Sequence, residues 1–309
     1  MPAPSDLLER LRAGGKPALA RALASIEAAR LTAATLDLLD ASWAAHGGRI
    51  IGLTGPPGVG KSSLAASLVI AWRDAGRTVG VVAIDPSSRR SGGALLGDRT
   101  RIDLDPEDQG VFVRSMAARS RLGGLADATF AAAVLMRALY DLVLIETVGV
   151  GQSETEIADL ADTVVLAVQP GSGDILQYMK AGIVEVPDLL VVTKADLGPL
   201  AERTRLDLQA GMRLRTADAG GRHVPVVSLS AATGEGVGRL IDAVDEHGAW
   251  LAGEERLDRR RAAGAARWLE LAVREEVGRR GYAKVAAGLA DDAVSPFRRL
   301  AAASAGFAG

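Results

Sequence analysis

One short stretch restricts the fold of this chain more than any other, "GPPGVGKSS" at residues 55–63. Its spacing, Gly55-x-x-x-x-Gly60-Lys61-Ser62, is the Walker A pattern of a phosphate-binding loop. A strand-like run, "RIIGLTG", precedes it and a helical run, "KSSLAASLVIAWRDAG", overlaps its end, which is the context that such a loop needs. We therefore predict an α/β sheet with this loop at the end of its first strand.

The residue types in the loop suit phosphate chemistry. The glycines let backbone N–H groups turn towards phosphate oxygens, and the helix that begins near Lys61 adds its positive dipole end. We expect Lys61 to bridge the β- and γ-phosphates and the Ser62 hydroxyl to bind Mg²⁺. The alternative is an ordinary glycine-rich turn between a strand and a helix. We disfavour it because the loop spacing, the lysine, the hydroxyl and the flanking strand and helix all agree with the Walker A pattern. The predicted nucleotide-binding loop comprises Gly55, Pro56, Pro57, Gly58, Val59, Gly60, Lys61, Ser62 and Ser63.

From residue 49 onward, short β-rich runs alternate with helical segments. The expected strands lie at 49–55, 78–86, 110–115, 141–149, 163–170, 188–196 and 224–231. Near-continuous apolar strands separated by helices indicate a mostly parallel sheet flanked by helices on both faces, as in P-loop nucleotide hydrolases. We expect this domain over residues 48–246, an N-terminal helical extension over 1–47 and a C-terminal helical extension over 247–309.

The two ends of the chain are predicted to be helical. Residues 5–46 have helical spacing with a break at Gly-Gly-Lys-Pro (14–17), after which we expect helix through residues 18–46. A charged helical tail follows Trp250, and residues 300–309 are small and weakly patterned, so we expect them to fray.

Charge and hydropathy limit the classes of partner. The net charge of −2 gives no reason to expect nucleic-acid binding. No apolar run approaches the ~18–20 residues that span a bilayer, and the N-terminal residues lack the apolar core of a signal peptide. We expect a cytoplasmic protein that binds neither nucleic acid nor membrane.

Two later segments indicate that the base is guanine. In "VVTKAD", the Asp196 carboxylate can accept both guanine N–H groups, and the Lys194 stem can lie over the base. Thr193 stands where the usual guanine motif has Asn. The segment "SLSAATGEG" is similar to a loop that contacts guanine through backbone N–H groups, which places Ser230, Ala231 and Ala232 near the base. Taken alone, "TKAD" could be an ordinary exposed turn between a strand and a helix. Because it lies after the Walker A loop and before Ser230 and Ala231, we favour GTP as the nucleotide.

Metal and switch residues are expected where strands end. Asp85 ends the second strand in "VAIDPSS", at the edge where open α/β sheets bind ligands. Asp98 lies in a charged, glycine-rich loop and either approaches Mg²⁺ or phosphate or is simply solvated. In "LVLIETVGVG", the Glu146 carboxylate can accept hydrogen bonds from metal-bound water, and the Gly149 N–H can reach the γ-phosphate. Val150 cannot orient an attacking water as Gln does in small GTPases, so we predict slow hydrolysis that a partner accelerates.

Taken in order, "GPPGVGKSS", "VAIDPSSRRSGGALLGDRTRI", "ETVGVGQSE", "DILQYMKAGIVEVPDLLVVTKAD" and "SLSAATGEG" resemble the methylmalonyl-CoA mutase-associated GTPases, a SIMIBI-class family once described as arginine/ornithine transport kinases. The resemblance covers residues 5–250. It implies a chaperone that hydrolyses GTP to GDP, binds an adenosylcobalamin-dependent acyl-CoA mutase, gates loading of its cofactor and helps to eject damaged cofactor.

The resemblance also implies particular residues. The neighbours of Mg²⁺ would be Ser62, Asp85, Asp98 and Glu146, and the catalytic group would be Lys61, Asp98, Glu146 and Gly149. The segment "GSGDILQYMKAG" is similar to an additional switch that couples nucleotide state to the mutase, with Asp174, Gln177 and Lys180 as candidates. A helical dimerisation arm is expected at the C-terminus, where this tail is short and alanine-rich, and the implied assembly is a homodimer.

Three other readings stay open. Sister GTPases that deliver nickel carry Cys or His transfer sites, and this chain has no cysteine and only the scattered His46, His223 and His247. A P-loop kinase would need a pocket for the phosphate acceptor and a catalytic base, and no segment of the sequence indicates either. A GTP-binding partner that never hydrolyses nucleotide is the third. The client could be methylmalonyl-CoA mutase, which we favour, or the mutase for isobutyryl-CoA or hydroxyisobutyryl-CoA.

Overall fold

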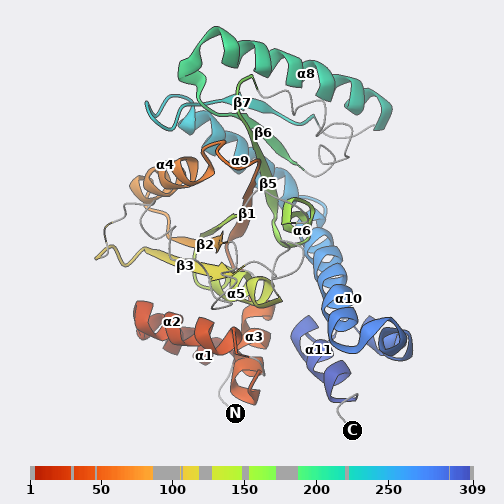
Figure 1. Cartoon of the computed structure of the whole chain (residues 1–309). Coiled ribbons are helices and arrows are strands. Elements are labelled where there is room, and N and C mark those ends of the chain that lie inside the picture. Colours follow the sequence, from red (N-terminus) through yellow and green to blue (C-terminus); the bar gives the residue numbers. More distant parts are fainter. Residues whose placement is uncertain are drawn as a thin grey trace.

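Figure 1 shows the computed structural model of the chain. It describes residues 4–28, 31–45, 47–85, 105, 107–117, 127–147, 153–171, 187–219, 223–291 and 293–306. Helices lie on both faces of a central sheet, and the two ends of the chain lie on the same side of the molecule. Within the described ranges, no helix combines the length and the apolar character that crossing a membrane requires.

The sheet confirms the predicted fold class. Its strands are β1 Arg49–Thr54, β2 Val79–Asp85, β3 Val111–Ala117, β4 Leu142–Glu146, β5 Thr163–Val168, β6 Leu189–Val192 and β7 Val226–Ser228. They are hydrogen-bonded in the order β3-β2-β4-β1-β5-β6-β7, and every described pair is parallel. All seven expected strands are therefore present, and the sheet is parallel throughout its described part.

Helices cover both faces because the strands are apolar on both sides. The connecting helices are α4 Lys61–Asp74, α5 Asp127–Arg137, α6 Ser153–Leu160, α8 Pro199–Ala219 and α9 Val237–Ala252. Every residue of β4 and β5 is buried, as expected for a parallel sheet with two covered faces. α4 and α9 pack on one face, and α5 and α6 pack on the other (Figure 1). α8 continues the second layer over β5 and β6.

The N-terminal prediction needs one correction. Residues 4–44 form three helices, α1 Pro4–Ala13, α2 Gly15–Ile26 and α3 Ala33–Ala44. The expected break is confirmed only at Gly14, because α2 begins at Gly15 and not at residue 18. The single helix expected over 18–46 is wrong. Thr32 is extended, and its hydroxyl accepts a hydrogen bond from the Thr35 N–H at 3.1 Å, so it caps a new helix.

The C-terminal prediction also needs a correction. After α10 Arg256–Val285, which kinks at Gly278, and the short η4 Ala286–Ala290, the chain forms α11 Pro296–Ala305. Fraying of residues 300–305 is therefore wrong. Phe297 is 1% exposed and packs its ring against Trp268, 5.4 Å away, while Arg298 pairs with Asp37 and Asp40 of α3. These contacts, which local sequence pattern does not reveal, hold the terminal helix.

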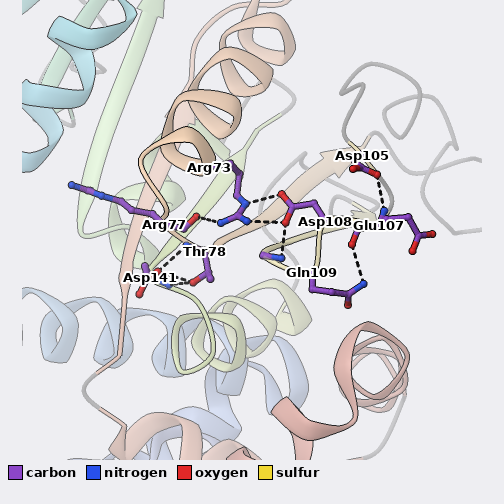
Figure 2. A network of polar contacts seen from close by, with 9 residues as sticks. Arg73, Arg77, Thr78, Asp105, Glu107, Asp108, Gln109 and Asp141 are labelled. Carbon is purple, nitrogen blue, oxygen red and sulfur yellow. Dashed lines mark hydrogen bonds and ion pairs between the residues drawn. The ribbon is translucent and has the colours of Figure 1, made fainter.

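A polar network fixes the chain where it enters β3 (Figure 2). Near the end of α4, Arg73 donates to both carboxylate oxygens of Asp108, at 2.7 and 2.8 Å, and to the Arg77 carbonyl at 2.6 Å. The Arg73 guanidinium, together with the Gly110 N–H, lowers the pKa of Asp108 to about 2. Beside it, Asp141 accepts from the Thr78 N–H and hydroxyl at 2.7 and 2.8 Å. The helix that follows the predicted phosphate loop is thus tied to the chain before β2 and β3, and the amino ends of β2 and β4 are tied to each other.

Candidate nucleotide-binding site

The glycine-rich loop follows β1 directly and ends in α4. Gly55 has φ +142, and a Cβ there would lie 2.3 Å from the Ala167 carbonyl oxygen, so only glycine fits. Gly60 has φ +99 and forms the N-cap of α4. The loop therefore presents backbone N–H groups at a helix N-terminus, an arrangement that favours anions.

Lys61 is folded back over this loop. Its side chain is 7% exposed, and the ammonium donates to the carbonyls of Gly55 and Pro56 at 2.8 and 3.1 Å. The positive charge therefore lies at the centre of the loop, where a phosphate chain would pass.

Ser62 and Glu146 meet beside the loop. The Ser62 hydroxyl donates to Glu146 Oε1 at 2.7 Å, and Glu146 is 5% exposed at the end of β4. Asp85, the last residue of β2, lies at the same edge because Ala83 is in register with Glu146. Hydroxyl and carboxylate oxygens are the donors that Mg²⁺ prefers, so the residues present fit that ion.

A second pair of hydroxyls fixes the backbone just beyond Glu146. The Thr147 hydroxyl donates to Thr54 Oγ1 at 3.0 Å, and the Thr147 N–H donates to the Leu53 carbonyl at 3.1 Å. Both threonines are 1% exposed. The end of β4 is thereby tied to the residue just before the glycine-rich loop.

The predicted base motif lies against the same loop. The Thr193 hydroxyl lies 2.8 Å from the Val59 carbonyl and 3.2 Å from the Val168 carbonyl, and the residue is 4% exposed. The Lys194 ammonium donates to the Gly58 carbonyl at 3.2 Å and to Gln169 Oε1 at 3.0 Å. Thr193, in the position where Asn was expected, contacts the glycine-rich loop.

Asp196 and the turn after β7 complete the part of the site that is predicted to bind the base. The buried Ser230 hydroxyl donates to Asp196 Oδ1 at 2.6 Å, and Asp196 itself is exposed. Ala231 is half-buried and Ala232 is exposed in the turn that follows. The two predicted guanine segments are thus joined by a direct hydrogen bond, with the lysine stem beside them.

Several predicted residues are not placed. Asp98, Gly149, Val150, Asp174, Gln177 and Lys180 lie outside the described residues. Of the histidines, His223 is exposed and His247 is buried, with Nδ1 2.8 Å from the Thr163 hydroxyl. In the described ranges, no three His, Asp or Glu side chains are grouped as a metal centre.

Sequence reasoning missed three polar contacts of this site. They are the Lys194–Gln169 contact, the Thr54–Thr147 pair and the Ser230–Asp196 bond. Each joins residues at the ends of different strands, so no local spacing in the sequence carries a signal for it. Gln169 and Thr147 each fall near the end of an expected strand, at 163–170 and 141–149, and this was the one hint of these contacts in the sequence.

The family model, the similar sequences and a similar solved structure were compared with this chain. The model of the methylmalonyl Co-A mutase-associated GTPase MeaB family matches residues 19–286. A Pyrococcus abyssi protein named as a GTPase is 41% identical over 261 residues, which are 83% of this chain and 79% of that protein. The mitochondrial methylmalonic aciduria type A homolog of Mus musculus is 40% identical over 200 residues, which are 63% of this chain and 48% of the mouse protein. A crystal structure described as an LAO/AO transport system kinase has a TM-score of 0.67 at 26% identity, covering 99% of this chain and 98% of that one.

Proposed function

The chain belongs to the methylmalonyl Co-A mutase-associated GTPase family, and on that premise we propose that it serves as the GTP-dependent chaperone of an adenosylcobalamin-dependent acyl-CoA mutase. It is a GTPase that binds guanine nucleotides. In the proposal, hydrolysis gates the loading of adenosylcobalamin and protects or reactivates the mutase. The observation that carries it is the family match over residues 19–286, which is a match to mutase-associated proteins. Methylmalonyl-CoA mutase is the client that we favour.

The nucleotide would lie along the carboxyl edge of the sheet. Residues 55–63 would hold the phosphates, with the Lys61 ammonium moving from the loop carbonyls to the β- and γ-phosphate oxygens. Asp196 would accept the guanine N–H groups, since its carboxylate is exposed and one oxygen is held by Ser230. Lys194, Ala231 and Ala232 would border the base.

The Ser62–Glu146 contact supports a magnesium ion at the phosphates. Ser62 would bind Mg²⁺ directly, and Glu146, Asp85 and Asp98 would surround it. When bound, the ion neutralises the charge of the β- and γ-phosphate oxygens. The chain's own contribution is to hold hydroxyl and carboxylate in place, through the tie between Thr147 and Thr54.

Hydrolysis is proposed to be slow without the mutase. Gly149 would donate to the γ-phosphate, and Val150 supplies no group that orients water. Asp174, Gln177 and Lys180 would couple the nucleotide state to the mutase. The proposed three-part division at residues 47 and 246, and a homodimer formed through the C-terminal helices, belong to the same hypothesis.

Single-turnover GTP cleavage, with and without purified acyl-CoA mutase, tests the function. We expect cleavage well below ~1 s⁻¹ alone and a clear acceleration by the mutase. Ser62→Ala should lose most of both rates, since it removes the hydroxyl proposed for Mg²⁺. An unchanged rate with every mutase tried, or a fast rate without one, would contradict the proposal.

A small-molecule kinase is the second candidate, because a similar solved structure is described as a transport system kinase. The test is to follow the γ-phosphate of labelled GTP. Release of all label as inorganic phosphate supports the GTPase chaperone, whereas label on a cationic amino acid or a transport component supports the kinase. Arginine and ornithine are the acceptors to try first.

A further inference from the structure

The strained backbone of Lys194 gives the starting point. Its φ is +53, a left-handed conformation that is unfavourable for a residue other than glycine. Such residues persist where the surroundings hold them, and two acceptors hold this one. The ammonium donates to Gln169 Oε1 at 3.0 Å and to the Gly58 carbonyl at 3.2 Å.

Gln169 is well placed to fix the lysine. It directly follows β5, is half-buried, and lies next to the strand end at which Thr193 and Lys194 follow β6. The backbone of Thr193 is itself fixed, since its N–H donates to the Val168 carbonyl at 2.9 Å. The lysine side chain therefore runs from a hydrogen-bonded backbone to two acceptors, which restricts the path of its methylene stem beside the glycine-rich loop.

We propose that Gln169 is a positioning residue for the guanine base, acting through Lys194. With the ammonium held, the lysine stem presents a preformed apolar surface for the base, so less side-chain freedom is lost on binding. This inference rests on the proposed role of Lys194 and Asp196 in holding guanine. Binding of the phosphate part of the nucleotide should change little, because the Lys61 ammonium is held by the Gly55 and Pro56 carbonyls and not by Gln169.

The test measures dissociation constants of GDP and of inorganic tripolyphosphate, which has no base, by calorimetry. A charged hydrogen bond at a partly exposed site predicts that Gln169→Leu weakens GDP binding about five-fold. Gln169→Glu keeps an acceptor for the ammonium and should bind GDP at least as well as the natural chain. Tripolyphosphate binding should change less than about two-fold in either variant.

Two controls separate a positioning role from a structural one. Gln109→Leu removes a glutamine that contacts the Glu107 carbonyl near the amino end of β3 (Figure 2), and should leave GDP binding unchanged. In a Lys194→Ala background, Gln169→Leu should have almost no further effect, since residues that act as a unit are not additive.

The outcomes distinguish this inference from the proposed function. If Lys194→Ala binds GDP as well as the natural chain, the proposed base site is wrong. If Lys194→Ala weakens GDP but Gln169→Leu does not, only the inference about Gln169 fails. Equal losses of GDP and tripolyphosphate, or a full Gln169→Leu effect in the Lys194→Ala background, would also overturn it.

Discussion

Gly264 in α10 lies against the helix that follows the predicted γ-phosphate sensor. α6 begins at Ser153, shortly after the "ETVGVGQ" segment, and packs on α10. A methyl group on Gly264 would lie 1.9 Å from the carbonyl oxygen of Asp159 in α6. That atom belongs to a helix backbone, so it cannot move aside as a flexible side chain would. Gly264→Ala must therefore push the two helices apart.

Two opposing effects set the change in the free energy of unfolding of Gly264→Ala. Replacing glycine by alanine inside a helix gains about 1 kcal/mol of helix propensity. Forcing an extra methyl into a close contact costs roughly 1–3 kcal/mol, and a backbone-to-backbone clash belongs at the upper end. The net expectation is a loss of about 2 kcal/mol in the free energy of unfolding, or roughly 4 °C in Tm for a chain of this size.

The matched control is Gly238→Ala in α9, where nothing lies within 4 Å of an added methyl group. That variant should gain up to about 1 kcal/mol, because only the propensity term remains. Thermal unfolding followed by circular dichroism measures both. If Gly264→Ala is as stable as Gly238→Ala, the close contact between α10 and α6 does not exist and the reasoning is wrong.

Three further changes test other parts of the fold by urea unfolding. The pKa of Asp108 is depressed to about 2 from an ordinary value near 3.8, so its stabilisation is present above about pH 4 and is lost as the pH falls towards 2. Asp108→Asn should cost about 1 kcal/mol at pH 7, after discounting for solvent screening, and almost nothing near pH 2; a loss that does not depend on pH would refute this. Phe297→Ala should cost ~3–5 kcal/mol because it empties the contact with Trp268, whereas a cost below ~1 kcal/mol would mean that α11 is not docked. Glu255→Gly should stabilise by about 1 kcal/mol, since Glu255 has φ +56, and destabilisation would argue against strain there.

The sheet was predictable because its signals are local. The apolar runs, the Walker A spacing and the turn after β7 each lie within about ten residues, so the seven strands and the glycine-rich loop follow from short-range patterns. Placing Glu146 beside Ser62 follows as well, because the carboxyl ends of neighbouring parallel strands share one edge.

The remainder depended on contacts between distant residues. The docking of α11 depends on Phe297 and Arg298 meeting residues more than 25 positions away, and the small residues around them gave no sign of it. Gln169 and Lys194 are likewise joined only when β5 and β6 pair. The break between α2 and α3 is a different case: its capping threonine, Thr32, was present in the sequence, but the strong helical spacing on both sides obscured it.

We propose that Glu146, beside the Ser62 hydroxyl, supports a GTP hydrolysis that an acyl-CoA mutase accelerates. The most direct measurement is the single-turnover rate of GTP cleavage in the presence of the acyl-CoA mutase, for Glu146→Gln against the natural chain. Glutamine keeps an oxygen for the Ser62 hydroxyl but removes the charge, and we expect the rate to fall about 10- to 100-fold while Tm changes little. A Glu146→Gln variant that cleaves GTP at the natural rate and is still accelerated by the mutase would contradict the account.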